Sequence, residues 1–169
     1  MSYRNKTYIA FASEDITYYR LMEAWKKNEN IDFDFFDAHD LYVSRDTSKP
    51  ETIKANLRER MKNAKQFVIL GSASAKKKGG DGVSFLAYEV ETMISLGLPV
   101  VIANLDGDRK IDRNFIPKPL LDDDYYTMSV SFQPKIIKYA LDNYATEFAL
   151  SDDTGPYYYK ASVYESLGL

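Results

Sequence analysis

The fold is decided by residues 66–104, which read QFVILGSASAKKKGGDGVSFLAYEVETMISLGLPVVIAN. One apolar run opens this stretch, Gln66–Leu70, and another closes it, Pro99–Asn104. Each has the length of a strand and contains Val and Ile, which indicates strands buried on both faces. Between them, residues from about Ser84 to Leu96 have a helical apolar spacing, and Gly97 predicts the end of that helix. A strand, a helix and a strand in this order predict a right-handed crossover in a parallel sheet.

The residues before this stretch repeat the alternation. Lys6–Ala12 predicts a first buried strand, and Asp15 is a candidate N-cap for the helix that follows. Ile31–Phe36 alternates apolar and acidic residues, which predicts a second strand with one exposed face, at an edge of the sheet. Ser48–Glu51 predicts a capping box for a second helix. The i, i+3, i+4, i+7 spacing predicts the apolar face of the first helix: Tyr18, Leu21, Met22 and Trp25.

The second half of the chain is less regular. Leu105–Asp124 contains two prolines and predicts a long connection with little regular structure. The charged, glycine-rich segment Lys76–Gly82 predicts a loop. Tyr125–Val130 predicts a short fifth strand, and Pro134 is expected to open a last long helix.

Strands that alternate with helices predict an α/β fold, here a single domain with a parallel sheet covered by helices on both faces. With Ile31–Phe36 at an edge, the flavodoxin-like strand order 2-1-3-4-5 follows. We expect residues 1–150 to form this domain and residues 151–169 to be an aromatic C-terminal extension that packs on the domain or on a partner. In this strand order a crevice lies at the carboxyl ends of strands one and three. Phe11–Ser13 and Gly71–Ser72 are expected to line it.

Composition excludes several chemistries. The 169 residues contain no Cys and one His, so disulfides, thiolate nucleophiles, Cys-ligated metal and multi-His metal sites are excluded, and no metal site is predicted. A formal net charge of −3 argues against broad nucleic-acid binding, since no basic excess exists to release counterions. The longest uncharged stretch is shorter than the roughly 18 residues that a membrane span needs. We therefore expect a cytoplasmic protein that binds neither nucleic acid nor membrane.

The helix predicted between the two buried strands carries a candidate catalytic carboxylate. At about 100° per residue, Glu89 lies roughly 80° from the centre of the apolar face, whereas Glu91 lies further away and is expected to be solvated. A helix glutamate is usually a surface residue, so the geometry leaves both interpretations open. His39, in the loop after the second strand, likewise has a structural and a functional interpretation. The Lys76–Lys78 run is compatible with a phosphate contact, although a solvated loop is the simpler interpretation.

Several segments together resemble a known family. Tyr8–Asp15, YIAFASED, resembles the first conserved box of TIR domains, in which a strand leads into Ser-x-Asp. Phe85–Glu91, FLAYEVE, is similar to the Trp-x-x-(Trp/Tyr)-Glu-(Ile/Leu)-Glu signature of bacterial TIR-like proteins. Ser48–Leu70 looks like the helix–strand unit that precedes their active-site loop, and Asp37–Asp46 would correspond to their BB loop. The resemblance covers residues 6–105, and within this group it is strongest to the stand-alone TIR proteins of the Thoeris antiphage system.

This resemblance implies an enzyme that cleaves NAD at the bond between nicotinamide and ribose. The product would be a cyclic or otherwise modified ADP-ribose that activates a separate effector protein, with NAD as substrate and no cofactor. The family's catalytic glutamate falls on Glu89, and Phe85 stands where the family usually has Trp. The candidate substrate-binding residues are Phe11, Ala12, Ser13, Asp37, His39, Ser72 and Phe85.

Two other functions stay open at this point. The chain is also similar to TIR-like adaptors, which are not enzymes and act by homotypic association. Nucleoside deoxyribosyltransferase-like enzymes share the expected fold and a catalytic glutamate. The TIR-like resemblance further implies that a homo-oligomer forms on activation.

Overall fold

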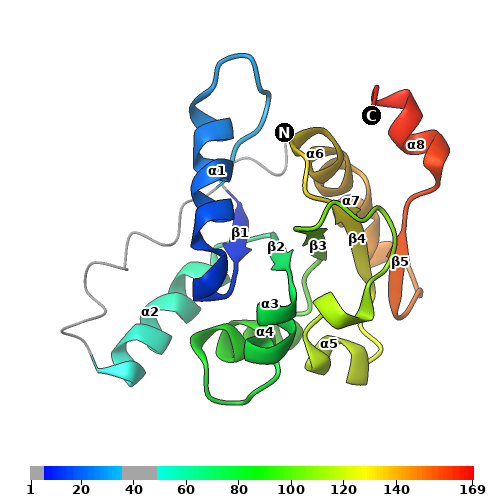
Figure 1. Cartoon of the computed structure of the whole chain (residues 1–169). Coiled ribbons are helices and arrows are strands. Elements are labelled where there is room, and N and C mark those ends of the chain that lie inside the picture. The colour runs from blue at the N-terminus through cyan, green and yellow to red at the C-terminus, as the bar shows by residue number, and fades with distance from the viewer. Residues whose placement is uncertain (1–5, 36–48) are drawn as a thin grey trace.

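The computed structural model describes residues 6–35 and 49–169 and confirms an α/β fold with a parallel sheet. Five strands lie in the order β1-β2-β3-β4-β5, and each pairs in parallel with its neighbour. Figure 1 shows β1 at one edge of this sheet and β5 at the other. The strand bounds are Thr7–Ala10 for β1, Gln66–Gly71 for β2, Val100–Asn104 for β3, Thr127–Ser131 for β4 and Pro156–Tyr158 for β5.

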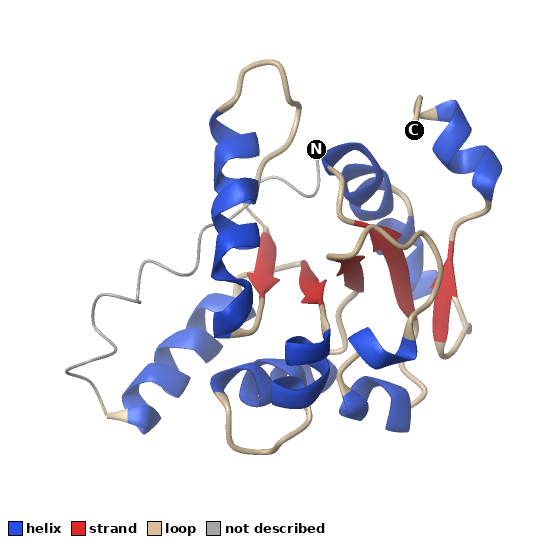
Figure 2. Ribbon diagram, in the orientation of Figure 1, coloured by secondary structure: helices blue, strands red, loops and turns tan. Residues whose placement is uncertain are grey.

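Helices cover both faces of the sheet, as Figure 2 shows. One apolar cluster joins one face of the strands to α1, α6, α7 and α8, and a second joins the other face to α2, α3, α4 and α5. The helix bounds are Ile16–Lys27 for α1, Pro50–Lys62 for α2, Ala73–Gly79 for α3, Phe85–Leu96 for α4, Lys118–Asp122 for α5, Pro134–Asp142 for α6, Tyr144–Glu147 for α7 and Ala161–Ser166 for α8. Single 3-10 turns span Ser13–Asp15, Arg113–Phe115 and Phe148–Leu150.

The predicted strand at Ile31–Phe36 is wrong over its described part, Ile31–Phe35, which forms no strand; Phe36 lies outside the described residues. The predicted order 2-1-3-4-5 is therefore wrong, although the four other predicted strands are neighbours in the expected order. The alternation has a different cause. Phe33 and Phe35 are buried beneath α1, but the backbone is satisfied locally: the Phe33 N–H donates to the Ile31 carbonyl, and the Phe35 N–H donates to the Asp34 carboxylate. Alternating burial thus arises here without a neighbouring strand.

The buried face of α1 also differs from the prediction. Tyr18 and Leu21 are 38% and 46% exposed, whereas Tyr19 and Met22 are buried. The Tyr19 ring stacks on Phe11, with ring centroids 4.7 Å apart, and meets the edge of Phe35. These aromatic contacts rotate the helix so that Tyr19, and not Tyr18, enters the core.

Three further local predictions need correction. Asp15 is the N-cap residue of α1, but its carboxylate does not cap the helix. The predicted capping box is displaced: Lys49 is the N-cap of α2, with no side-chain cap, and Ser48 lies outside the described residues. The predicted loop Lys76–Gly82 is helical as far as Gly79, because the Ser72 hydroxyl accepts a hydrogen bond from the Ala75 N–H (3.0 Å) and so caps α3.

The tyrosine-rich residues 151–169 add β5 to the sheet edge and α8 to one face. Tyr164 is fully buried, its hydroxyl accepts a hydrogen bond from the Ser131 N–H (3.1 Å), and the Arg109 guanidinium lies 4.4 Å from its ring centroid. Tyr157 packs edge-on against Tyr126. The extension therefore contributes buried side chains to the core around β4.

Replacing Tyr164 by Ala should lower the free energy of unfolding by about 3–5 kcal/mol, because a fully buried aromatic ring is lost and a cavity remains. Tyr158→Ala is the matched control: Tyr158 lies in the same extension but is 47% exposed, so its change should stay within about 0.5 kcal/mol. Urea unfolding of the two variants measures both values. Equal, small losses would contradict the packing described for α8.

Candidate active site

A cavity of about 180 Å³ opens beyond the carboxyl end of β1. It lies between the segment that follows this strand, α3, and the first turns of α4. The lining residues are Phe11, Ala12, Ser13, Lys78, Ser84, Phe85, Leu86 and Glu89. Parallel α/β sheets commonly bind ligands at this end of the strands, which makes the cavity the candidate active site.

Five sequence-predicted site residues come together around this cavity: Phe11, Ala12, Ser13, Phe85 and Glu89. Gly71 and Ser72, expected in the same crevice, do not line it. Asp37 and His39 lie outside the described residues, so their predicted roles stay predictions. Lys78 joins the lining because it belongs to α3 and not to the loop predicted from the sequence.

Glu89 is the buried carboxylate of the cavity, with 2% of the residue exposed. The predicted apolar face of α4 is confirmed, since Leu86, Val90 and Met93 are buried, and Glu91 is exposed as expected. The Glu89 carboxylate accepts a hydrogen bond from the hydroxyl of Tyr8, which is fully buried in β1. A carboxylate held out of water in a cavity is characteristic of functional sites, because an unpaired buried charge is otherwise strongly unfavourable.

A charged cluster lies beside the cavity. The Lys78 ammonium donates to the Ser13 hydroxyl (2.9 Å) and pairs with the Glu14 carboxylate. The hydrogen bond from Lys78, followed by that from Ser13, holds the pKa of Glu14 below its ordinary value. The cluster places one cation next to the space that Glu89 faces, where it suits a phosphate group.

Ser72 supports the site from outside its lining. Its hydroxyl donates to the Asp15 carboxylate and thereby joins the start of α3 to the 3-10 turn after β1. Burial raises the pKa of Asp15, and the hydrogen bond from Ser72 partly offsets that rise. This contact fixes the segment that carries Phe11, Ala12 and Ser13 against the end of β2.

A larger cavity, of about 440 Å³, runs along α6. Its charged groups include Lys138 and Asp32, which form an ion pair with each other at the surface. Glu89 is not part of its lining, so the smaller cavity remains the better candidate for chemistry.

The geometry agrees with the comparison with protein families. The family model described as "Thoeris protein ThsB, TIR-like domain" matches residues 8–110, more than half of the chain. The chain belongs to this TIR-like family. No curated protein sequence matches it well enough to be reported as a relative. All residues that line the Glu89 cavity fall within the part that matches the TIR-like domain of ThsB.

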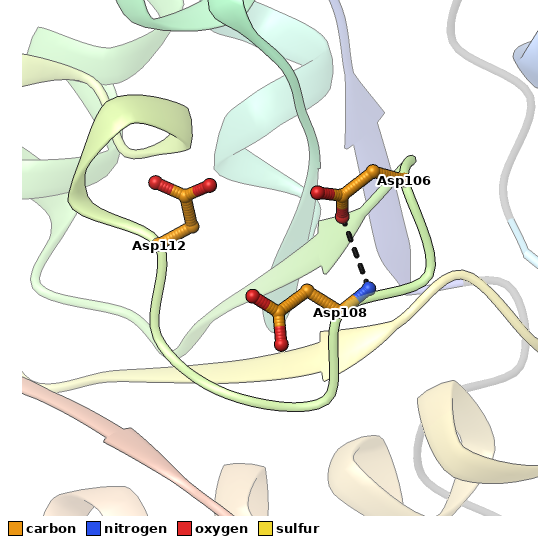
Figure 3. Close-up of side chains that lie close together, drawn as sticks. All are labelled: Asp106, Asp108 and Asp112. Atoms are coloured by element: carbon orange, nitrogen blue, oxygen red, sulfur yellow. Dashed lines mark hydrogen bonds between the residues drawn. The ribbon is translucent and has the colours of Figure 1, made fainter.

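The sequence analysis did not find a group of three aspartates at the edge of this TIR-like region. Carboxylate oxygens of Asp106, Asp108 and Asp112 lie within 4.8 Å of one another. Figure 3 shows that these side chains come from one loop after β3, and that Asp106 accepts a hydrogen bond from the Asp108 N–H (3.0 Å). Asp108 and Asp112 likewise accept from backbone N–H groups two residues further on. The D-x-D spacing was the available signal, and its hydrogen bonds are those of ordinary Asx turns.

Within the described residues, none of the helices has both the length and the apolar character needed to cross a bilayer.

The two acidic residues beside the cavity should respond to pH with opposite signs. A raised pKa means that folded Asp15 holds its proton more tightly than the unfolded chain, so its contribution to stability falls as pH rises above the ordinary value near 3.8. Asp15→Asn should therefore gain stability relative to wild type between about pH 4 and pH 7. Glu14 has a lowered pKa, so its contribution is present at neutral pH and is lost as pH falls.

Glu14→Gln serves as the control and should lose stability relative to wild type over the same interval. Unfolding midpoints measured across the pH range for the three proteins give both signs. A parallel response of the two variants would contradict the assigned environments.

Proposed function

We propose that this TIR-like protein cleaves NAD at the bond between nicotinamide and ribose, with Glu89 as the catalytic carboxylate. The observation that carries the proposal is the burial of Glu89 in the cavity formed with Phe11, Ala12, Ser13 and Phe85. The product is a cyclic or modified ADP-ribose that activates a separate effector in antiphage defence. Membership of the ThsB TIR-like family supports the link to defence and to an effector.

The proposed chemistry needs a carboxylate near the ribose. When the bond between the ribose C1′ and the nicotinamide nitrogen breaks, its electron pair leaves with nicotinamide, and positive charge develops on the ribose as in glycoside cleavage. A negative carboxylate held in place beforehand stabilises this charge. A nucleophile then forms a new bond to C1′. Water yields ADP-ribose and releases a proton, whereas a group of the same substrate yields a cyclic product.

The size of the cavity suggests how the substrate is divided. At about 180 Å³ it is smaller than the roughly 300–1,000 Å³ of pockets that enclose a drug-sized ligand. We therefore place the nicotinamide and its ribose inside, where the rings of Phe11 and Phe85 offer apolar contact for a flat heterocycle. The diphosphate lies at the mouth, near the Lys78 ammonium and the start of α4, since cations and helix N-termini both favour anions.

Glu89→Gln should lower nicotinamide release from NAD by about 10²–10⁴-fold, because the amide keeps the shape of the side chain but not its charge. Glu91→Gln is the matched control: it lies on the same helix, is exposed, and should retain wild-type activity. Nicotinamide is quantified by chromatography, with and without extract from phage-infected cells, and mass spectrometry identifies the nucleotide product.

Three outcomes would contradict the proposal. Undiminished nicotinamide release by the Glu89→Gln variant would reject the site. Concentration-dependent oligomers without NAD turnover in any condition would favour the adaptor. Base exchange on deoxynucleosides without action on NAD would favour a deoxyribosyltransferase-like enzyme.

A further inference from the structure

A buried tyrosine lies directly behind the candidate catalytic carboxylate. The Tyr8 hydroxyl donates a hydrogen bond to Oε2 of Glu89, across 81 positions of the sequence. Tyr8 is fully buried and does not line the cavity, so it contacts the carboxylate from the protein side. The sequence pattern explains Tyr8 only as an apolar strand residue, and an apolar role does not require a hydroxyl.

The sheet fixes where this hydroxyl lies. Tyr8 pairs with Phe67 in the register of β1 and β2, and their rings meet edge to face with centroids 6.0 Å apart. Ala10 and Ala12 follow Tyr8 on the same face of the chain, within the apolar cluster that contains Leu86 and Val90 of α4. Because these two side chains are small, they leave space beside β1 in which the hydroxyl and the Glu89 carboxylate meet.

We propose that Tyr8 is a positioning residue that holds the Glu89 carboxylate in one orientation and favours its ionised form. The inference rests on the proposed function of Glu89. A hydroxyl that donates to a carboxylate stabilises the charged form, and this effect is stronger in a site of low dielectric constant. A carboxylate has about four acceptor positions, so a bond to one oxygen orients the group without occupying all positions that a substrate hydroxyl uses.

Other charged groups near Glu89 act on the same carboxylate. Lys78 of α3 lines the same cavity and also favours the ionised form, although it is already paired with Glu14. On α4 itself, Tyr88 precedes Glu89, and its ring lies 5.5 Å from the ammonium of Lys54 of α2. Tyr8 differs from these groups because it donates directly to the carboxylate.

Tyr8→Phe tests the inference, since it removes one oxygen atom and keeps the ring. We expect kcat for NAD cleavage to fall about 10–100-fold while KM changes less than about threefold, because ground-state contacts to the substrate are kept. The acid limb of the pH–activity profile should move to higher pH, because the carboxylate loses a donor that favours its charged form.

Tyr125→Phe is the matched control. The Tyr125 hydroxyl donates to the Leu98 carbonyl (2.7 Å), and Tyr125 does not line the Glu89 cavity. Both Tyr→Phe variants lose one partly or fully buried hydrogen bond, so both should unfold about 2–6 °C below wild type. Only Tyr8→Phe should change kcat and the pH profile; a merely structural Tyr8 would change neither.

A double-mutant cycle makes the pairing measurable without turnover. Unfolding midpoints of Tyr8→Phe, Glu89→Gln and the double variant should be non-additive, because each single change removes the same hydrogen bond. Additive effects would overturn the inference. If wild type cleaves NAD and Glu89→Gln does not, but Tyr8→Phe keeps wild-type kcat and pH profile, the inference alone fails. If wild type cleaves no NAD in any condition, the proposed function fails and the positioning role fails with it.

Discussion

The inner strands of this protein must be shielded from water on both faces, and the other elements are arranged around that requirement. Every residue of β1, β2, β3 and β4 is buried. Parallel strands with apolar side chains on both faces are stable only between two layers of helices. Ile9 and Val68 accordingly belong to the cluster that contains α1 and α6, while Ala10 and Ile69 belong to the cluster that contains α2 and α4.

The candidate site lies where this apolar covering includes a charged group. Glu89 occupies a position on α4 between residues that pack on the sheet, so its carboxylate is carried into a region of low dielectric constant. The hydroxyl of Tyr8 offsets part of that unfavourable burial. The same environment that makes the carboxylate unfavourable for folding makes it effective against developing positive charge.

Tyrosine hydroxyls satisfy backbone groups at several other buried places, which accounts for part of the tyrosine-rich composition. The Tyr144 hydroxyl accepts from the Val100 N–H (2.9 Å) and donates to the Tyr126 carbonyl (2.7 Å), and Tyr164 accepts from Ser131. Burial raises the pKa of Tyr144 well above its ordinary value, so it stays a neutral hydroxyl that can donate and accept. A long ring with a polar end reaches unpaired backbone groups at strand ends that an apolar side chain would leave without a partner.

The sequence by itself determined the buried strands, the crossover between them and the place of Glu89 beside the apolar face of α4, because these follow from local periodicity. It also placed Phe11, Ala12, Ser13 and Phe85 near one end of the sheet. Only the tertiary structure decided that Ile31–Phe35 is buried without joining the sheet, that residues 156–158 supply the edge strand, and that Lys78 borders the cavity. The hydrogen bond between Tyr8 and Glu89 belongs to the same group. Such features depend on which distant segments fit together, and local spacing carries no record of that fit, because it reports which side of an element is buried and not what lies against it.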